Sequence, residues 1–224
     1  MKNKLVLACV VASAFAGAPA VAQRLPAPRP PSVFVPFFTW TGAYTGFNLG
    51  YGLGTSTWGT PSTGATTGHF RAQGMQVGGT LGYNYETAGF VVGLETDLDW
   101  SGIKGSTNHP TCASFCETKN TWLGTLRGRL GYALDRYMPY VTGGMAYGGI
   151  QTANSLSATT RSKIGYTLGT GSEYYFMHNW SAKIEYLYVD LGHVTCNTSC
   201  TGGGAERDVK LNMHVVRTGV NFKF

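Results

Sequence analysis

The stretch "WLGTLRGRLGY", residues 122–132, places two arginines in a run that is otherwise apolar or small. In an extended chain, successive side chains point to opposite faces, so alternate residues share a face. Trp122, Leu126 and Tyr132 then lie on one face, and Arg127 and Arg129 lie on the other. Two guanidinium groups on one face of a strand need either water or acidic partners, and the rest of the sequence indicates which.

The composition does not suit a surface that faces water. Charged residues make up 12% of the 224 residues, whereas ordinary soluble domains contain about 25%. Gly occurs 32 times, and aromatic residues reach 13%. A chain of this length can form one all-β domain, and its composition favours a domain whose outer surface contacts lipid.

The N-terminus has the pattern of an export signal. Lys2 and Lys4 precede an apolar stretch, and small residues before Ala22 form a cleavage site. A transmembrane helix is the alternative, because residues 5–22 contain no charge. Pro19 and the Ala-x-Ala ending favour a signal peptide over residues 1–22, cleaved after Ala22.

Cleavage would leave a mildly basic protein. With Lys2 and Lys4 removed, 15 basic and 11 acidic residues remain, a net charge of +4. Because no basic cluster stands out, we expect no nucleic-acid partner.

Four cysteines remain after cleavage, as Cys112-x-x-x-Cys116 and Cys196-x-x-x-Cys200. An even number of cysteines in an exported chain favours disulfides, and we predict two small loop disulfides. Four thiolates could instead hold a tetrahedral zinc ion. The sequence does not determine the connectivity.

The chain divides into three segments. Residues 1–22 form the signal peptide, residues 23–39 form a Pro-rich periplasmic tail, and residues 40–224 form the main domain. Five prolines between residues 24 and 38 exclude a helix or a central strand there.

Eight strands with alternating side chains are predicted in the main domain. They span residues 40–52, 72–86, 88–101, 119–133, 138–150, 162–176, 179–191 and 209–224. The connections alternate between long and polar (53–71, 102–118, 151–161, 192–208) and short (86–89, 134–138, 177–179). This alternation is typical of a transmembrane barrel with long outer loops and short periplasmic turns. We therefore predict an eight-stranded antiparallel up-and-down transmembrane β-barrel.

The volume of the bulky side chains decides which face is outward. The interior of an eight-stranded barrel accommodates only modest side chains, so the dense set of Trp, Tyr and Phe cannot all lie inside. We expect these residues to contact lipid and to form aromatic belts near the strand ends. Gly, Thr, Asn and single charges then line the lumen.

The acidic partners of the two arginines lie on the preceding strand. Glu95, Asp97 and Asp99 would face the same lumen as Arg127 and Arg129, where they can form charge-assisted pairs. A second set is expected on the last three strands. Its members are Glu173, Lys183, Glu185, Arg217 and Lys223. A lumen filled in this way leaves no wide aqueous channel.

Several segments resemble a known family. They are "WTGAYTGFNLGYGLG" (40–54), "GFVVGLETDLDW" (89–100), "TLRGRLGYA" (125–133), "PYVTGGMAYG" (139–148), "GYTLGTGSEYYF" (165–176), "WSAKIEYLYVDLG" (180–192) and "VVRTGVNFKF" (215–224). The chain resembles the small porin-like outer-membrane β-barrel family of Gram-negative bacteria, in its immunogenic surface-protein and haemin-binding branch. The resemblance implies location in the cell outer membrane, loops exposed to hosts, and a structural or adhesive role without catalytic residues. It also implies that Phe224 is an assembly signal for the barrel-insertion machinery. The paired loop cysteines depart from the family pattern.

Three functions remain as hypotheses. The first is a structural and interaction barrel, whose partners are outer-membrane lipid and lipopolysaccharide. The second is a haemin-binding or adhesin-type receptor that contacts haemin or host surface molecules through its loops. The histidines that could serve it are His69, His109, His193 and His214, although their spacing is not that of ligands. The third is a lipid hydrolase or acyltransferase using His214 and a serine, for which no supporting spacing exists. We therefore expect no enzyme activity, cofactor or metal.

Overall fold

The computed structural model describes residues 38–59, 66–108, 116–154, 158–196 and 207–224. In this part of the chain no helix is long and apolar enough to cross a membrane. The predicted signal peptide and most of the Pro-rich tail lie outside the described residues and stay predictions.

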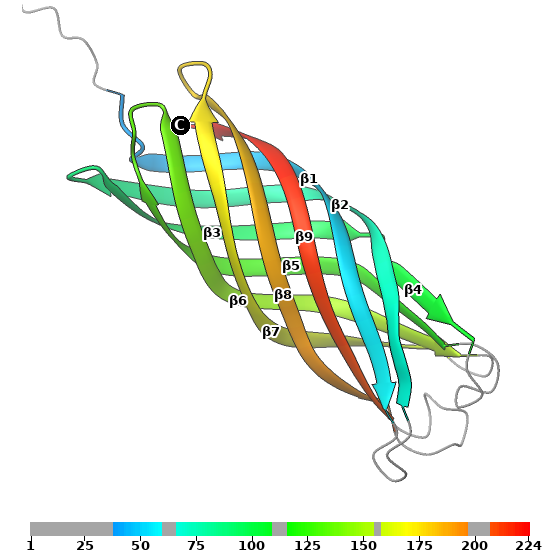
Figure 1. Ribbon diagram of the computed structural model, residues 1–224. Coiled ribbons are helices and arrows are strands. Elements are labelled where there is room, and N and C mark those ends of the chain that lie inside the picture. The colour runs from blue at the N-terminus through cyan, green and yellow to red at the C-terminus, as the bar shows by residue number, and fades with distance from the viewer. Residues whose placement is uncertain (1–37, 60–65, 109–115, 155–157, 197–206) are drawn as a thin grey trace, which may run out of the picture. The chain divides into compact units, whose positions relative to one another are not determined.

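The described chain forms a single antiparallel sheet that closes on itself (Figure 1). The strands are β1 Gly42–Gly59, β2 Thr66–Thr87, β3 Phe90–Ser101, β4 Lys104–Thr107, β5 Cys116–Tyr132, β6 Tyr137–Asn154, β7 Ala158–Tyr175, β8 Trp180–Cys196 and β9 Arg207–Lys223. Closure follows because β1 pairs with both β2 and β9. The predicted eight-stranded barrel is confirmed, with β3 and β4 as two segments of its third strand.

The break between β3 and β4 leaves the wall intact. Ser101 is paired with Gln76, and Lys104 is paired with Gln73, so the register with β2 is the same on both sides. Between them, the Gly102 nitrogen donates to the Met75 oxygen at 2.9 Å. The third strand therefore continues towards the loops.

The strands are longer than the sequence predicted. Much of the expected long connections, 53–71, 102–118, 151–161 and 192–208, is paired strand. These segments were predicted as loops because they are rich in Gly, Ser and Thr. Above the lipid a barrel wall needs no apolar outer face, so the hydrogen-bonded ladders continue there without the alternation that marks a strand.

The three short turns, β2–β3, β5–β6 and β7–β8, lie together at the end of the barrel opposite the long connections (Figure 1). Between β2 and β3, Ala88 and Gly89 have φ angles of 50° and 83°. Positive φ at both central residues is the geometry of a two-residue type I′ hairpin. Asp135, between β5 and β6, also has a positive φ of 57°. The tight turns predicted at these positions are confirmed.

The two faces of each strand have the predicted orientation. Leu126 is 45% exposed on the outer wall, whereas Arg127 and Arg129 are 1% and 3% exposed. In β3, exposed and buried residues alternate along the strand. The bulky apolar face of the wall therefore points outward, and the charged face points into the lumen.

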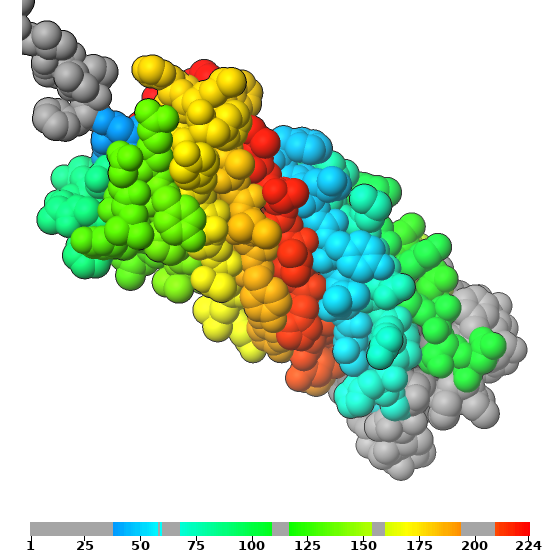
Figure 2. Space-filling model, turned by 45° about the horizontal axis from the view of Figure 1, so that its top comes forward, coloured from blue at the N-terminus to red at the C-terminus, as the bar shows by residue number. Residues whose placement is uncertain are grey.

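Aromatic rings gather at both ends of the outer wall. Near the short turns, Phe90 packs on Tyr132 with a centroid separation of 5.3 Å. Nearer the loops, Trp122 packs edge-to-face on Tyr147 at 5.9 Å. The space-filling view shows side chains closing the wall over β8, β9 and β1 (Figure 2). These positions suit the two interfacial belts of a membrane barrel.

Candidate functional site

The barrel interior is divided into three layers along its length. The layer nearest the short turns, here the turn-side core, contains Trp40, Val91, Met138, Tyr140 and Tyr175. The ionic layer contains Glu95, Asp97, Asp99, Arg127, Arg129, Glu173, Lys183, Glu185 and Arg217. The layer nearest the loops, here the loop-side core, contains Phe70, Ala72, Ile103, Leu123, Ala146, Ile150, Leu187, Val189, Leu191, Val209, Leu211, Met213 and Val215.

Arg127 on β5 connects acids from two walls of the barrel. Its Nη2 donates to Glu95 and, at 2.7 Å, to Asp97 on β3. Its Nη1 donates to Glu185 on β8 at 2.9 Å, and its Nε donates to Thr125 at 3.1 Å. The guanidinium group is fully buried and holds β5, β3 and β8 together through charge-assisted bonds.

Arg217 on β9 makes a parallel set of contacts. Its Nε donates to Glu185 at 2.6 Å, and its Nη2 donates to Asp97 at 2.8 Å. Its Nη1 lies 3.3 Å from Asp99. Asp97 and Glu185 are therefore each shared between Arg217 and Arg127, so the two cations belong to one network.

The remaining cations extend this network towards the short turns. Arg129 pairs with Glu173 on β7, and its guanidinium carbon lies 3.8 Å from the centroid of the Tyr140 ring. Lys183 on β8 donates to Glu95 on β3 at 3.2 Å. The Arg129–Glu173 and Lys183–Glu95 pairs cross the interior between strands that are not adjacent in the sheet.

The sequence predicted two separate sets of charges, and the structure joins them into one. Alternation identifies the residues that face inward, but not which strands face each other across the lumen. Lys223 is a correction, because it lies outside the ionic layer. Its Nζ donates to the carbonyl oxygen of Thr39 and lies 5.7 Å from the centroid of the Phe38 ring.

Neutral donors supply further hydrogen bonds to the acids. The ionic layer holds five acids, Glu95, Asp97, Asp99, Glu173 and Glu185, against four cations, Arg127, Arg129, Lys183 and Arg217. Tyr44 donates to Glu95 at 2.8 Å, and Tyr140 donates to Glu185 at 3.1 Å. Thr80 and Thr125 each donate to Asp97 at 2.7 Å. The buried carboxylates thus gain the extra hydrogen bonds that buried ion pairs need to offset their desolvation.

The turn-side core closes the periplasmic end of the barrel. Trp40 is 1% exposed, and its Nε1 donates to the carbonyl oxygen of Asp135 at 3.0 Å. Its ring packs on Tyr175 at 4.6 Å, and Phe38 packs on Tyr175 at 4.7 Å. The sequence analysis placed Trp40 at the start of a lipid-facing strand. Phe38 lies near the end of the predicted Pro-rich tail, and Trp40 follows the tail. The sequence analysis did not predict that the Trp40 ring enters the barrel.

The loop-side core closes the other end, which corrects the prediction of a lumen lined only by small and charged residues. Interior glycines supply the volume for its large side chains. A Cβ atom on Gly52 would lie 2.2 Å from the Ile103 Cδ1 atom, so the isoleucine occupies space that the glycine leaves free. The volume argument failed here because it judged each position separately, whereas large and small residues face each other across the lumen. The sequence contained the information needed to place Leu123 inside. Adjacent residues of a strand point to opposite faces, so an outward-facing Trp122 requires Leu123 to face the lumen.

The other predicted site residues lie on the outer wall or outside the described residues. His69 is hydrogen-bonded to Thr57 at 2.7 Å, and His214 is hydrogen-bonded to Tyr186 at 2.6 Å. His193 is exposed on β8. His109 lies outside the described residues. In the described ranges no group of three His, Cys, Asp or Glu residues could hold a metal.

The cysteine and assembly-signal predictions remain untested. Cys112 and Cys200 lie outside the described residues, and the backbones of Cys116 and Cys196 lie at the loop-side ends of β5 and β8. Phe224 is 73% exposed next to Phe222, and its nitrogen donates to the Ala43 oxygen at 3.0 Å.

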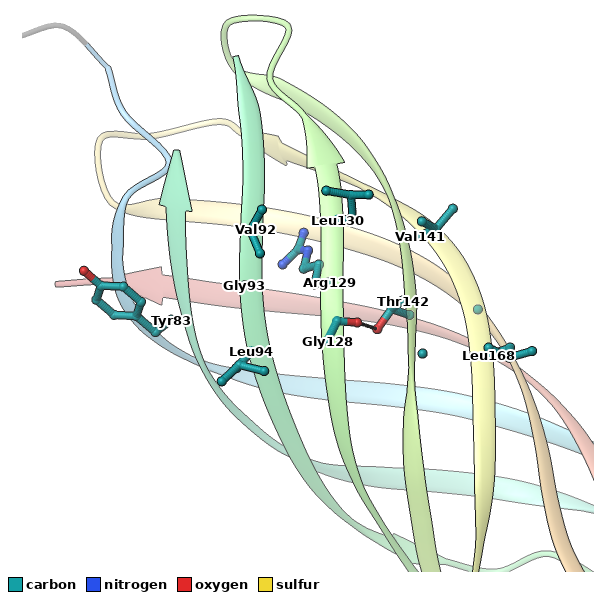
Figure 3. A pocket seen from close by; sticks show the side chains of 12 residues that line it. Tyr83, Val92, Gly93, Leu94, Gly128, Arg129, Leu130, Val141, Thr142 and Leu168 are labelled. Carbon is teal, nitrogen blue, oxygen red and sulfur yellow. Dashed lines mark hydrogen bonds between the residues drawn. The ribbon is translucent and has the colours of Figure 1, made fainter. Parts of the chain in front are cut away.

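A hollow of about 780 Å³ lies on the outer wall and not in the lumen. Gly128 and Gly143 are directly paired on neighbouring strands, and they lie between Leu94 and Leu168 in the same row of the sheet. Because neither glycine has a side chain, the outer surface is hollow at this point. In Figure 3 the apolar side chains around it project from the strands, while Thr142 donates to the Gly128 oxygen at 2.9 Å. The hollow is therefore a dent in the lipid-facing surface.

Comparisons with known proteins agree with this architecture. The family model described as "Outer membrane protein beta-barrel domain" matches residues 6–224. The 31 kDa outer-membrane immunogenic protein of Brucella melitensis is 35% identical over 242 residues, covering 99% of this chain and all of the relative. The 25 kDa outer-membrane immunogenic protein of Brucella abortus is 33% identical, covering 95% of this chain and 92% of the relative.

Among solved structures, the outer membrane protein OprG of Pseudomonas aeruginosa matches with a TM-score of 0.54 and 13% identity. The match covers 82% of this chain and 97% of OprG, and at this identity it shows the shared fold alone. The family match places the protein in the cell outer membrane, as the sequence predicted. With its closed antiparallel barrel, its lipid-facing wall and a family match over almost its whole length, the chain belongs to the outer-membrane β-barrel protein family.

Proposed function

We propose that the protein is a structural and surface-interaction barrel whose lumen does not conduct solutes. The observation that best supports this proposal is the division of the interior into an ionic layer between two apolar cores. Eight-stranded barrels have an interior just wide enough for side chains to fill, and here side chains fill it at three levels. This arrangement supports a role in anchoring the wall and holding the loops above the outer leaflet.

The same proposal assigns the partners. Outer-membrane lipid and lipopolysaccharide surround the wall, the barrel-insertion machinery reads the exposed Phe224 at the C-terminus, and host surface molecules meet the long connections. We assign the protein no catalytic role, because His214 bonds to Tyr186 on the outer wall and the interior charges are held in ion pairs.

Haemin capture receives less support from the geometry. His69, His193 and His214 lie on three different strands of the outer wall. A titration of the refolded barrel with haemin tests this alternative, and a Soret shift that saturates at one haemin per barrel would restore it.

Conductance in planar bilayers tests the sealed lumen. The refolded protein should insert without producing steady ion currents, because each layer excludes water from the axis. A matched preparation of a wide-pore barrel would control for insertion. Steady openings in the nanosiemens range would contradict the proposal.

A further inference from the structure

Three basic side chains project from the outer wall near the loop-side aromatic belt. Arg71 lies on β2, Lys104 lies on β4 and Lys119 lies on β5. Arg71 and Lys104 are exposed and Lys119 is half-buried, while the residues next to them in the chain, such as Ala72 and Asn120, are buried in the interior. The three cations therefore point away from the lumen.

These cations are brought together by strand pairing. Lys104 and Lys119 are direct partners in the ladder between β4 and β5. Directly opposed residues have Cβ atoms about 5 Å apart, and like charges in this position repel. Arg71 is close as well, since a Cβ atom on Gly105 would lie 2.3 Å from the Arg71 carbonyl oxygen.

One acid lies near these cations. Glu117 is on the same outer face of β5, opposite Ser106. Among the described residues it forms no ion pair within 4.0 Å with Arg71, Lys104 or Lys119. Counting Glu117, the group carries a net charge of +2, so an external anion would relieve the repulsion.

The position of the group along the wall indicates its surroundings. Trp100 and Trp122 are direct partners on β3 and β5, on the membrane side of the two lysines. Trp100 is 66% exposed, and its ring lies over Gly102, between Trp100 and Lys104 in the chain. Indole rings concentrate where hydrocarbon meets headgroups, so the cations next to them lie at the depth of the headgroups.

We propose that Arg71, Lys104, Lys119, Trp100 and Trp122, here the basic–aromatic cluster, bind the phosphorylated headgroup of an outer-leaflet glycolipid. Phosphate oxygens accept charge-assisted hydrogen bonds from Arg and Lys, and the indoles contact the upper part of the acyl chains. A glycolipid that carries two phosphomonoesters has a charge of about −3 to −4 at neutral pH, whereas a phosphodiester lipid carries a single negative charge. The larger charge and the greater number of acceptor oxygens suit three cations spread over β2, β4 and β5. This inference rests on the lipopolysaccharide partner proposed above and gives it a site. It does not depend on the sealed lumen, so a failed conductance test would leave it standing.

The test uses the full barrel in nanodiscs of phosphatidylcholine doped with bis-phosphorylated lipid A. Native mass spectrometry then counts the lipid A molecules retained by the wild type, by the K104Q/K119Q variant and by the K210Q variant. Lys210 is exposed on the outer wall of β9 and paired with Thr57 on β1, so its variant removes the same charge from another part of the wall. We expect the wild type and K210Q to retain one lipid A and the double variant to bind about 30-fold more weakly, since each basic residue at an anionic headgroup contributes about 1 kcal/mol.

Further arms distinguish the sources of phosphate. Phosphatidylglycerol in place of lipid A should be retained more weakly, and inorganic phosphate should not displace lipid A. If K104Q/K119Q fails to fold, as judged by heat-dependent gel migration, the single variant R71Q should weaken retention about fivefold. Four results would each overturn the proposal. They are an equal weakening in K210Q, unchanged binding in the folded K104Q/K119Q or R71Q variants, equal retention of phosphatidylglycerol, and displacement of lipid A by inorganic phosphate.

Discussion

The ionic layer and the loop-side core fill the same barrel by different physical means. In the ionic layer, long charged side chains reach across the lumen, as Arg127 does from β5 to Glu185 on β8. In the loop-side core, apolar side chains such as Ile103 fill the space left by interior glycines. The ionic layer depends on the pairing of opposite charges, whereas the loop-side core depends on apolar side chains filling the available space. A fault in each layer therefore has a different cost.

Removal of one cation from the ionic layer should have the largest effect. Arg127→Met leaves Glu95, Asp97 and Glu185 with fewer partners at buried positions. Removing one partner of a buried ion pair lowers the free energy of unfolding by about 3–5 kcal/mol, because the other charge stays buried without its partner. Urea unfolding of the barrel in lipid vesicles, followed by tryptophan fluorescence, measures the free energy of unfolding.

The matched control is Arg136→Met, since Arg136 is exposed in the turn before β6. This variant should unfold close to the wild type. Equal stability of Arg127→Met and Arg136→Met would show that the ionic layer does not hold the strands together.

Truncation in the loop-side core should have a smaller effect. Ile103→Ala leaves a cavity above Gly52 and should cost about 2–4 kcal/mol, the range for large-to-small changes in a packed core. The same unfolding experiment measures it. Ile164→Ala on the outer wall, where Ile164 is 75% exposed, is the control and should cost less because lipid fills the vacated space. A larger loss in Ile164→Ala would indicate that the loop-side core is poorly packed.

The predictable part of this fold follows from side-chain alternation. The pattern in "WLGTLRGRLGY" placed Leu126 outward and Arg127 inward, and the structure has both in these positions. The alternation of strand-like runs with long and short connections also predicted the number of strands and the tight turns. These features follow from the two-residue period of a strand, which can be read from one sequence without its relatives.

The unpredicted part depends on distances across the closed barrel. Alternation cannot show that Arg129 on β5 meets Glu173 on β7 across the intervening β6, because curvature and register determine which side chains meet. Nor could it reveal that Trp40 enters the lumen, since a ring at a strand end is equally compatible with a lipid belt. The loop-side strand extensions were missed because they lack an apolar outer face.

The central claim is that acids and bases from non-adjacent strands neutralise each other inside the barrel, and a double-mutant cycle on Arg129 and Glu173 tests it most directly. The free energy of unfolding is measured for Arg129→Met, Glu173→Gln and the double variant. Because each single change leaves one buried charge without its partner, the double variant should be destabilised by about 2 kcal/mol less than the sum of the two single changes. Additive losses would contradict the account, since they would mean that the two residues do not interact across the lumen.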